Sequence, residues 1–163
     1  MIRNLVLWSL LLALTGCATG PKYPVSEVNP EIRPDLVSTS PESAKGTKVL
    51  WGGVIASNRN LADATQLEII AYPLSSSNQS PQTGKASEGR FLVVTPGYLE
   101  SVDYAVGRRI TVTGSLQDTV AGRIGETPYQ YPVVSPDDIY LWPRDAGSGS
   151  IPIRFGIGFI FSN

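Results

Sequence analysis

The chain has 163 residues with 13 basic and 14 acidic side chains, giving a formal net charge of −1, and its length suits one domain. This charge balance gives nucleic-acid binding no electrostatic support, because Lys and Arg contacts to phosphate dominate that affinity. The sequence contains no histidine and only one cysteine, which excludes His-based triads, His metal ligands and internal disulfides. We therefore expect no enzyme activity, no metal site and no nucleic-acid partner.

Residues 1–16 have the organisation of a secretory signal peptide. Arg3 precedes an apolar run of about ten residues, which is shorter than the roughly 18–20 residues of a membrane-spanning helix. The run leads into Leu14-Thr15-Gly16-Cys17, which matches the bacterial lipobox. In that motif the thiol is diacylated, the chain is cut before the cysteine, and the new amino group is acylated.

We predict cleavage between Gly16 and Cys17, with diacylglycerol and an N-acyl chain on Cys17 as the only non-protein groups. One acyl chain anchors a protein marginally, whereas three hold it firmly. The alternative is an ordinary secretory signal followed by an incidental, reactive thiol. Losing Arg3 with the signal peptide would change the net charge from −1 to −2.

Residues 17–45 are predicted to form an extended, proline-rich tether. Its five prolines forbid a continuous helix, and the polar residues between them leave little apolar surface to bury. Part of the tether could instead wrap the domain, with one helical turn at 34–37. The residues that would form such a docking strip are Val25, Val28, Ile32 and Leu36.

Residues 46–143 are predicted to form an all-β domain. Glycine (16) and proline (13) are more frequent than average, and short apolar runs lie between turn residues. Glycines inside two of the strands, at Gly52-Gly53 and Gly114, indicate bends. Bent strands favour a small OB-like barrel, closed or partly open, over a sandwich. The expected strands are 47–56, 65–74, 89–95, 107–117 and 139–142, with 121–134 as a possible sixth.

Alternation in the second of these strands predicts that Leu67, Ile69 and Ala71 face inward. The connections at 58–60 and 135–138 are predicted to be turns. The polar segment 75–88 is predicted to be an exposed, mobile loop. Segment 98–105 is predicted to form a short helix or wide turn that carries Tyr98, Leu99 and Tyr104 into the core.

These segments resemble the Slp family of outer-membrane lipoproteins, which is named for a starvation-inducible member. The matching pieces lie in the family's order and cover nearly all of 46–143. They are the lipobox, VLWGGVI (49–55), EIIAYPL (68–74), SEGRFLV (87–93), GRRITVTG (107–114), GETPYQYPVV (125–134) and YLW (140–142). The chain departs from the family in its ending, which has a Gly/Ser spacer and an apolar strand.

The resemblance implies a lipoprotein on the periplasmic face of the outer membrane, acting as a structural or interaction module in envelope maintenance or stress. It implies no reaction. Residue 18 is alanine, and the aspartate that favours retention in the inner membrane of Gram-negative cells is absent. This absence also points to the outer membrane.

Tyr129 and Tyr131 suggest an alternative, ligand-binding function. If their segment is a strand, the two rings project to one face. Because OB barrels bind oligosaccharides and oligonucleotides with exposed aromatics, this face could take a sugar, a peptide or a small hydrophobic molecule. Glu126 could form a polar site with Arg90, Arg108 or Arg109, with Arg90 and Glu126 as the candidates on this face, although a satisfied salt bridge explains these two residues more simply. Trp51 and Trp142 are expected in the core.

Two further interpretations involve acidic side chains. Asp137-Asp138 is better explained as a solvated turn than as a cation site, because two adjacent carboxylates lack the other oxygen ligands that calcium requires. A hydrolase using Asp103, Glu126 and Asp138 is the weakest hypothesis, because it would need these carboxylates to converge on a cleft.

Residues 144–163 are predicted to be a Gly/Ser linker followed by an apolar strand. Apolar residues alternate strictly along this strand, which is a period-2 pattern. It could add to the edge of this barrel, pair with an envelope protein or a second copy, or contact the membrane, which a single strand cannot span alone. The candidate partner-strand residues are Ile153, Phe155, Ile157, Phe159 and Phe161.

Overall fold

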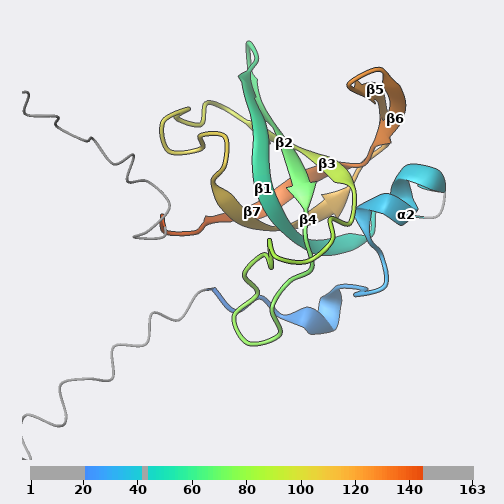
Figure 1. The fold of residues 1–163 in the computed structure, drawn as a ribbon, viewed down its shortest axis with the longest axis vertical. Coiled ribbons are helices and arrows are strands. Elements are labelled where there is room, and N and C mark those ends of the chain that lie inside the picture. Colours follow the sequence, from blue (N-terminus) through green and yellow to red (C-terminus); the bar gives the residue numbers. More distant parts are fainter. Residues whose placement is uncertain (1–20, 42–43, 145–163) are drawn as a thin grey trace, which may run out of the picture.

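Five strands of the computed structural model form a closed barrel, as predicted for an OB-like domain (Figure 1). The structure describes residues 21–41 and 44–144. The barrel order is β1-β2-β3-β7-β4, and all neighbours are antiparallel except β3 and β7, which are parallel. The barrel strands are β1 (Lys48–Asn60), β2 (Ala64–Ala71), β3 (Arg90–Pro96), β4 (Arg109–Leu116) and β7 (Val133–Leu141).

Three smaller features surround the barrel. A hairpin of β5 (Val120–Ile124) and β6 (Thr127–Tyr131) lies between β4 and β7 in the chain, and Gly125 makes its turn with φ = 58°. The short helices η2 (Val25–Glu27) and α2 (Pro34–Thr39) precede the barrel. Neither they nor any other helix in the described ranges is long and apolar enough to cross a membrane.

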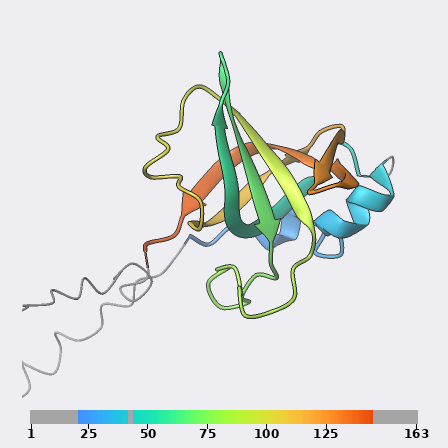
Figure 2. The same cartoon turned by 45° about the horizontal axis from the view of Figure 1, so that its top comes forward.

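Glycine lets β1 and β4 bend sharply enough to close the barrel. Gly53 pairs with Ala71 of β2 on one side and Ile110 of β4 on the other, so the backbones approach from both sides. A Cβ at this position would lie 1.9 Å from the carbonyl oxygen of Ile70. A Cβ at Gly114 would lie 2.3 Å from the carbonyl oxygen of Ser135. The curvature of β1 is visible in Figure 2.

The structure corrects both predicted turns. β1 continues through 58–60, and the chain reverses at 61–63 instead. Residues 135–138 lie inside β7, where the register against β4 shifts and leaves Asp137 as an extra residue. Such a bulge accommodates Pro136, because proline is tolerated in a strand where the ladder is interrupted.

The core confirms the predicted alternation of β2. Leu67, Ile69 and Ala71 are buried, while the residues between them are partly exposed. Phe91 packs edge-on against Trp51 with ring centroids 5.2 Å apart. Among the three residues predicted to enter the core from 98–105, Leu99 and Tyr104 pack against it. Tyr98 is exposed, so that part of the prediction is wrong.

Residues 21–41, hereafter the N-terminal strap, lie along the barrel. The indole Nε1 of Trp51 donates to the carbonyl oxygen of Ile32 at 2.8 Å, and the side chain of Val37 is in the core. Of the predicted docking strip, Ile32 packs against the core, whereas Val25 and Leu36 are exposed. α2 confirms the helical turn predicted at 34–37.

The loop after β2 is more ordered in its first half than its polar composition predicts. Leu74 and Pro81 form a β-bridge, and Pro81 is buried. The hydroxyl of Thr111 on β4 donates to the carbonyl oxygen of Gln79 at 2.8 Å. Residues 76–77 and 83–87 are exposed, and the rest of the first half of the loop forms part of the surface against which the strap lies.

Candidate functional site

The two candidate ligand-face tyrosines lie on β6 and share one face, but they face the barrel. Tyr131 is only 6% exposed and packs with Leu92 and Val133 in a small apolar cluster outside the main core. Tyr129 packs against this cluster, with its ring edge-on to that of Tyr131 and centroids 4.8 Å apart. The hairpin therefore covers part of the outer surface of β3 with its aromatic side.

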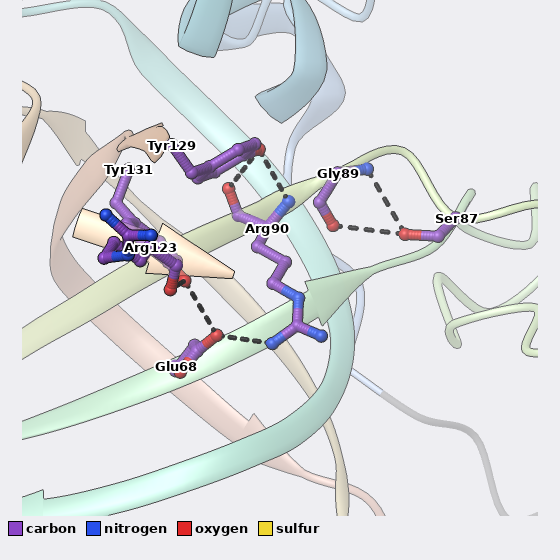
Figure 3. Close-up of polar contacts among 7 residues, drawn as sticks. All are labelled: Glu68, Ser87, Gly89, Arg90, Arg123, Tyr129 and Tyr131. Atoms are coloured by element: carbon purple, nitrogen blue, oxygen red, sulfur yellow. Dashed lines mark hydrogen bonds and ion pairs between the residues drawn. The ribbon is translucent and has the colours of Figure 1, made fainter. Parts of the chain in front are cut away.

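The hydroxyls of both tyrosines are engaged within the protein (Figure 3). The hydroxyl of Tyr129 accepts from the backbone N–H of Arg90 at 3.0 Å and donates to the carbonyl oxygen of Arg90 at 3.2 Å. The hydroxyl of Tyr131 lies 3.2 Å from Glu68 Oε1 and 3.1 Å from the carbonyl oxygen of Arg123. Burial, followed by the neighbouring Glu68 carboxylate, raises the pKa of Tyr131. The hydroxyls of Tyr129 and Tyr131 therefore both help to hold the hairpin in place.

Arg90 joins this group, but its ion-pair partner is not the predicted one. Its Nη1 lies 2.6 Å from Oε1 of Glu68, a neighbour on β2. Glu126 is exposed at the β5–β6 turn, where its carbonyl oxygen accepts from Arg123. The proposed Arg90–Glu126 salt bridge is therefore wrong. Sequence reasoning missed Glu68 because the choice between these two acids depends on which strands pair.

This arrangement bears directly on ligand binding. OB barrels commonly bind ligands on the face of their second and third strands. Here Tyr129, Tyr131, Arg90 and Glu68 join the hairpin to that face. An incoming sugar would therefore compete with contacts that the chain already makes with itself.

The paired aspartates on β7 also have protein partners. Asp137 forms an ion pair with Lys48, and Asp138 accepts a hydrogen bond from the hydroxyl of Tyr23. Within residues 21–41 and 44–144, no three acidic side chains gather as a potential metal site. The strap and the barrel thus use both carboxylates of the predicted turn as structural contacts.

A cavity of about 590 Å³ lies between the strap and the barrel. Trp51 and Tyr72 contribute aromatic surface and Leu74 aliphatic surface, while Arg33 and Glu88 supply charged groups. Its volume is within the range of small-molecule sites, which are mostly apolar with a few polar groups. No sequence pattern predicts this cavity, because its walls come from four separated segments of the chain.

Glu88 lines this cavity, and the pKa of its carboxyl group is shifted. Burial raises its pKa, an effect that Arg33 opposes. A raised pKa in the folded state means that the folded protein binds the proton more tightly than the unfolded chain does. The stability that protonated Glu88 contributes is therefore complete below the pKa that Glu88 has in the unfolded chain. It is lost as pH rises through the higher pKa that Glu88 has in the folded protein.

We predict that Glu88→Gln makes the protein more stable than wild type at neutral pH, because the amide does not ionise. The advantage should shrink as pH falls toward the ordinary range of glutamate. Thermal unfolding measured across this pH range checks the prediction, with exposed Glu100→Gln as the control. Equal melting temperatures for Glu88→Gln and wild type at neutral pH would contradict it.

The comparison with protein families concerns nearly the whole chain. The model of the Outer membrane lipoprotein Slp family matches residues 14–154. This chain belongs to that family. The match confirms the resemblance read from the strand motifs and places the chain among outer-membrane lipoproteins.

Two relatives from Escherichia coli K12 carry informative names. The chain is 31% identical over 144 residues to "Uncharacterized lipoprotein YeaY", covering 87% of this chain and 73% of that protein. It is 27% identical over 144 residues to "Outer membrane protein Slp", covering 87% and 76%. An uncharacterized protein of Haemophilus influenzae is 33% identical over 139 residues, covering 82% and 73%.

A small single-stranded DNA-binding protein from Streptomyces coelicolor has a similar solved structure, with a TM-score of 0.39 and 14% identity, covering 60% of this chain and 94% of that one.

Two groups of predicted site residues lie outside the described ranges. They are the cleavage and lipidation residues, Gly16 and Cys17, and the candidate partner strand in 151–161.

Proposed function

We propose that the protein is an outer-membrane lipoprotein held by acylated Cys17, with its barrel acting in the periplasm as an interaction module in envelope maintenance or stress. The observation that carries this proposal is that the family match begins at residue 14 and so includes the lipobox. The relatives named as a lipoprotein and an outer-membrane protein support the same cellular location.

An interaction module fits the described geometry better than a catalyst does. The three acids of the hydrolase hypothesis lie on different elements: Asp103 in the β3–β4 loop, Glu126 in the β5–β6 turn and Asp138 on β7. Asp138 is already bonded to Tyr23. Since glycoside hydrolysis, for example, needs two carboxylates that flank one bond, the placement of these three acids favours binding over such a reaction.

Replacing Cys17 tests the anchor. We expect Cys17→Ser to leave the signal peptide attached or to release the protein from the outer membrane, because serine cannot take the thioether-linked diacylglycerol. Membrane fractionation with labelled palmitate provides the readout, and Thr19→Ser serves as the control. A processed Cys17→Ser protein that still resides in the outer membrane would contradict the proposal.

The cavity supports a second candidate function, the binding of a small apolar molecule. We place this site in the cavity rather than on the Tyr129/Tyr131 face, because those hydroxyls are already occupied. Arg33 and Glu88 in the wall would orient a polar head group, while Trp51 and Leu74 would contact an apolar body.

Filling the cavity tests this function with N-phenyl-1-naphthylamine as the probe. Val28 lines the cavity, so Val28→Trp should lower probe affinity at least about tenfold, which corresponds to about 1.4 kcal/mol. Val120→Trp on the exposed face of the hairpin is the matched control and should leave binding unchanged. Equal fluorescence titrations of both variants would remove the cavity as the site.

A further inference from the structure

The strap's contacts leave little free chain between the predicted anchor and the barrel. The backbone of Tyr23 exchanges two hydrogen bonds with the side chain of Gln79, at 2.9 and 3.0 Å, and its hydroxyl donates to Asp138. Further along, the backbone N–H of Asp35 donates to the carbonyl oxygen of Glu88 at 2.9 Å. The strap is therefore bound to the barrel from near its first described residue.

The length of the remaining spacer follows from covalent geometry. Cys17 and Tyr23, which makes these first contacts, are six residues apart, and six extended residues span at most about 22 Å. This distance is less than the roughly 30 Å thickness of a bilayer's hydrocarbon core. A barrel held by a lipid on Cys17 must therefore lie close to the membrane surface, whatever the conformation of the spacer.

One end of the barrel exposes several large apolar side chains. They belong to two adjoining connections, the β1–β2 turn and the β3–β4 loop, and are between 48% and 74% exposed. Hydrogen bonds join the two connections: Gly97 N–H to the carbonyl oxygen of Asp63 at 3.0 Å, and Asn60 Nδ2 to Ser101 Oγ at 3.3 Å. We call this surface the apolar rim; it comprises Leu61, Tyr98, Val102 and Val106.

The part of the apolar rim that lies on the β3–β4 loop is on the same side of the molecule as both ends of the described chain, whereas the β1–β2 turn lies at the top of both views. In Figures 1 and 2, the blue start at residue 21, the red end at residue 144 and the yellow β3–β4 loop share one side, while the β5–β6 hairpin lies on the other. The guanidinium of Arg144 also donates to the carbonyl oxygen of Val102 at 2.9 Å. The described chain thus begins on the side where the β3–β4 loop exposes apolar residues.

We propose that the apolar rim lies against the bilayer surface, so that the barrel is docked on the membrane rather than suspended from it. This inference rests on the proposed anchor at Cys17. The short spacer favours lipid as the occupant, because any protein partner at the rim would have to fit within the same narrow gap. Exposed apolar patches of this kind often mark membrane or protein contacts.

Charge around the rim indicates what kind of lipid contact it makes. The exposed charges on the two connections and the adjoining strand ends show no basic excess, because Arg59 and Arg144 stand against Asp63, Glu100 and Asp103. Attraction to anionic lipid would require an excess of basic residues. Docking should therefore depend on apolar contact and change little with salt or with the anionic lipid content.

A single fluorescent label tests the proposal on the full, lipidated chain. Cys17 is the only cysteine, so in acylated protein the thiol of Val102→Cys is the only one that reacts with the environment-sensitive dye NBD. In vesicles of phosphatidylethanolamine and phosphatidylglycerol, we expect a blue-shifted NBD emission that nitroxide-labelled lipid quenches. Ala121→Cys on the exposed side of β5 is the control and should show neither effect.

The outcomes separate docking from anchoring. Docking is overturned, and the anchor is left intact, if the protein binds vesicles but the label at 102 shows the same emission and quenching as the label at 121. A Cys17 thiol that reacts with dye in the unsubstituted protein overturns the anchor and docking with it. Blue-shifted emission at 102 in soluble Cys17→Ser protein without vesicles also overturns docking, because the C-terminal segment or a second copy then covers the rim.

Discussion

Gly53→Ala is expected to destabilise the protein by about 3 kcal/mol or more, since overpacking of this severity lies at the upper end of what single substitutions cost. The alanine Cβ would lie 1.9 Å from the carbonyl oxygen of Ile70 and 2.8 Å from Cγ2 of Ile69. Because β1 pairs with β2 and β4 at this residue, the backbone cannot move away from one neighbour without disturbing the other.

Urea unfolding followed by tryptophan fluorescence measures this loss. Gly84→Ala is a matched control, because no heavy atom lies within 4 Å of its Cβ and its φ needs no glycine. The control should stay within about 0.5 kcal/mol of wild type. Similar midpoints for the two variants would show that barrel closure does not depend on close backbone approach at Gly53.

Trp51→Ala is expected to have the second large effect, a loss of about 3–5 kcal/mol, as is typical when a buried aromatic is truncated. The substitution removes the edge-on contact with Phe91 and the hydrogen bond to Ile32. It therefore weakens the core and releases one attachment of the strap. Trp51→Phe keeps most of the ring and should lose only about 0.5–1.5 kcal/mol, the usual contribution of one hydrogen bond.

Strap release can be followed separately from global stability. Glu27 and Glu31 are exposed on the strap, so a glutamate-specific protease should cut there faster in Trp51→Ala than in wild type under native conditions. Tyr98→Ala, at an exposed position, is the control for loss of an aromatic ring. Unchanged cleavage in Trp51→Ala would mean that the strap does not depend on this indole.

Local sequence patterns predicted the class of fold because they reflect local physics. Alternation in β2 identified its buried face at Leu67 and Ile69, and the glycines at 53 and 114 marked strands that bend. The absence of long helical periodicity completed the argument for a small barrel. None of these inferences required knowledge of which strands are neighbours.

Features that depend on pairing or on distant segments were not predictable in the same way. Arg90 chooses Glu68 because β2 lies beside β3, and Pro136 fits within a strand because β7 has a bulge against β4. The strap's proline content indicated an extended chain but not its contacts with Trp51 and Gln79. The cavity and the apolar rim exist only once these segments are assembled.

The packing of the strap limits how far a lipid on Cys17 lets the barrel move from the membrane. A free tether over 17–45 would let the domain move far from the membrane, whereas a strap bound from Tyr23 onward leaves a spacer of about 22 Å at most. A lipid anchor at Cys17 would then fix which side of the barrel faces the bilayer. If the barrel acts in the periplasm as proposed, a partner there would meet the opposite side, where the β5–β6 hairpin lies (Figure 2).

Mass spectrometry of the N-terminal peptide from the purified mature protein tests the lipid anchor most directly. We predict a peptide that begins at Cys17 and carries diacylglycerol on the thiol and an acyl chain on the amino group. A peptide that begins before Cys17, or one that contains Cys17 with a free thiol, would contradict the anchor.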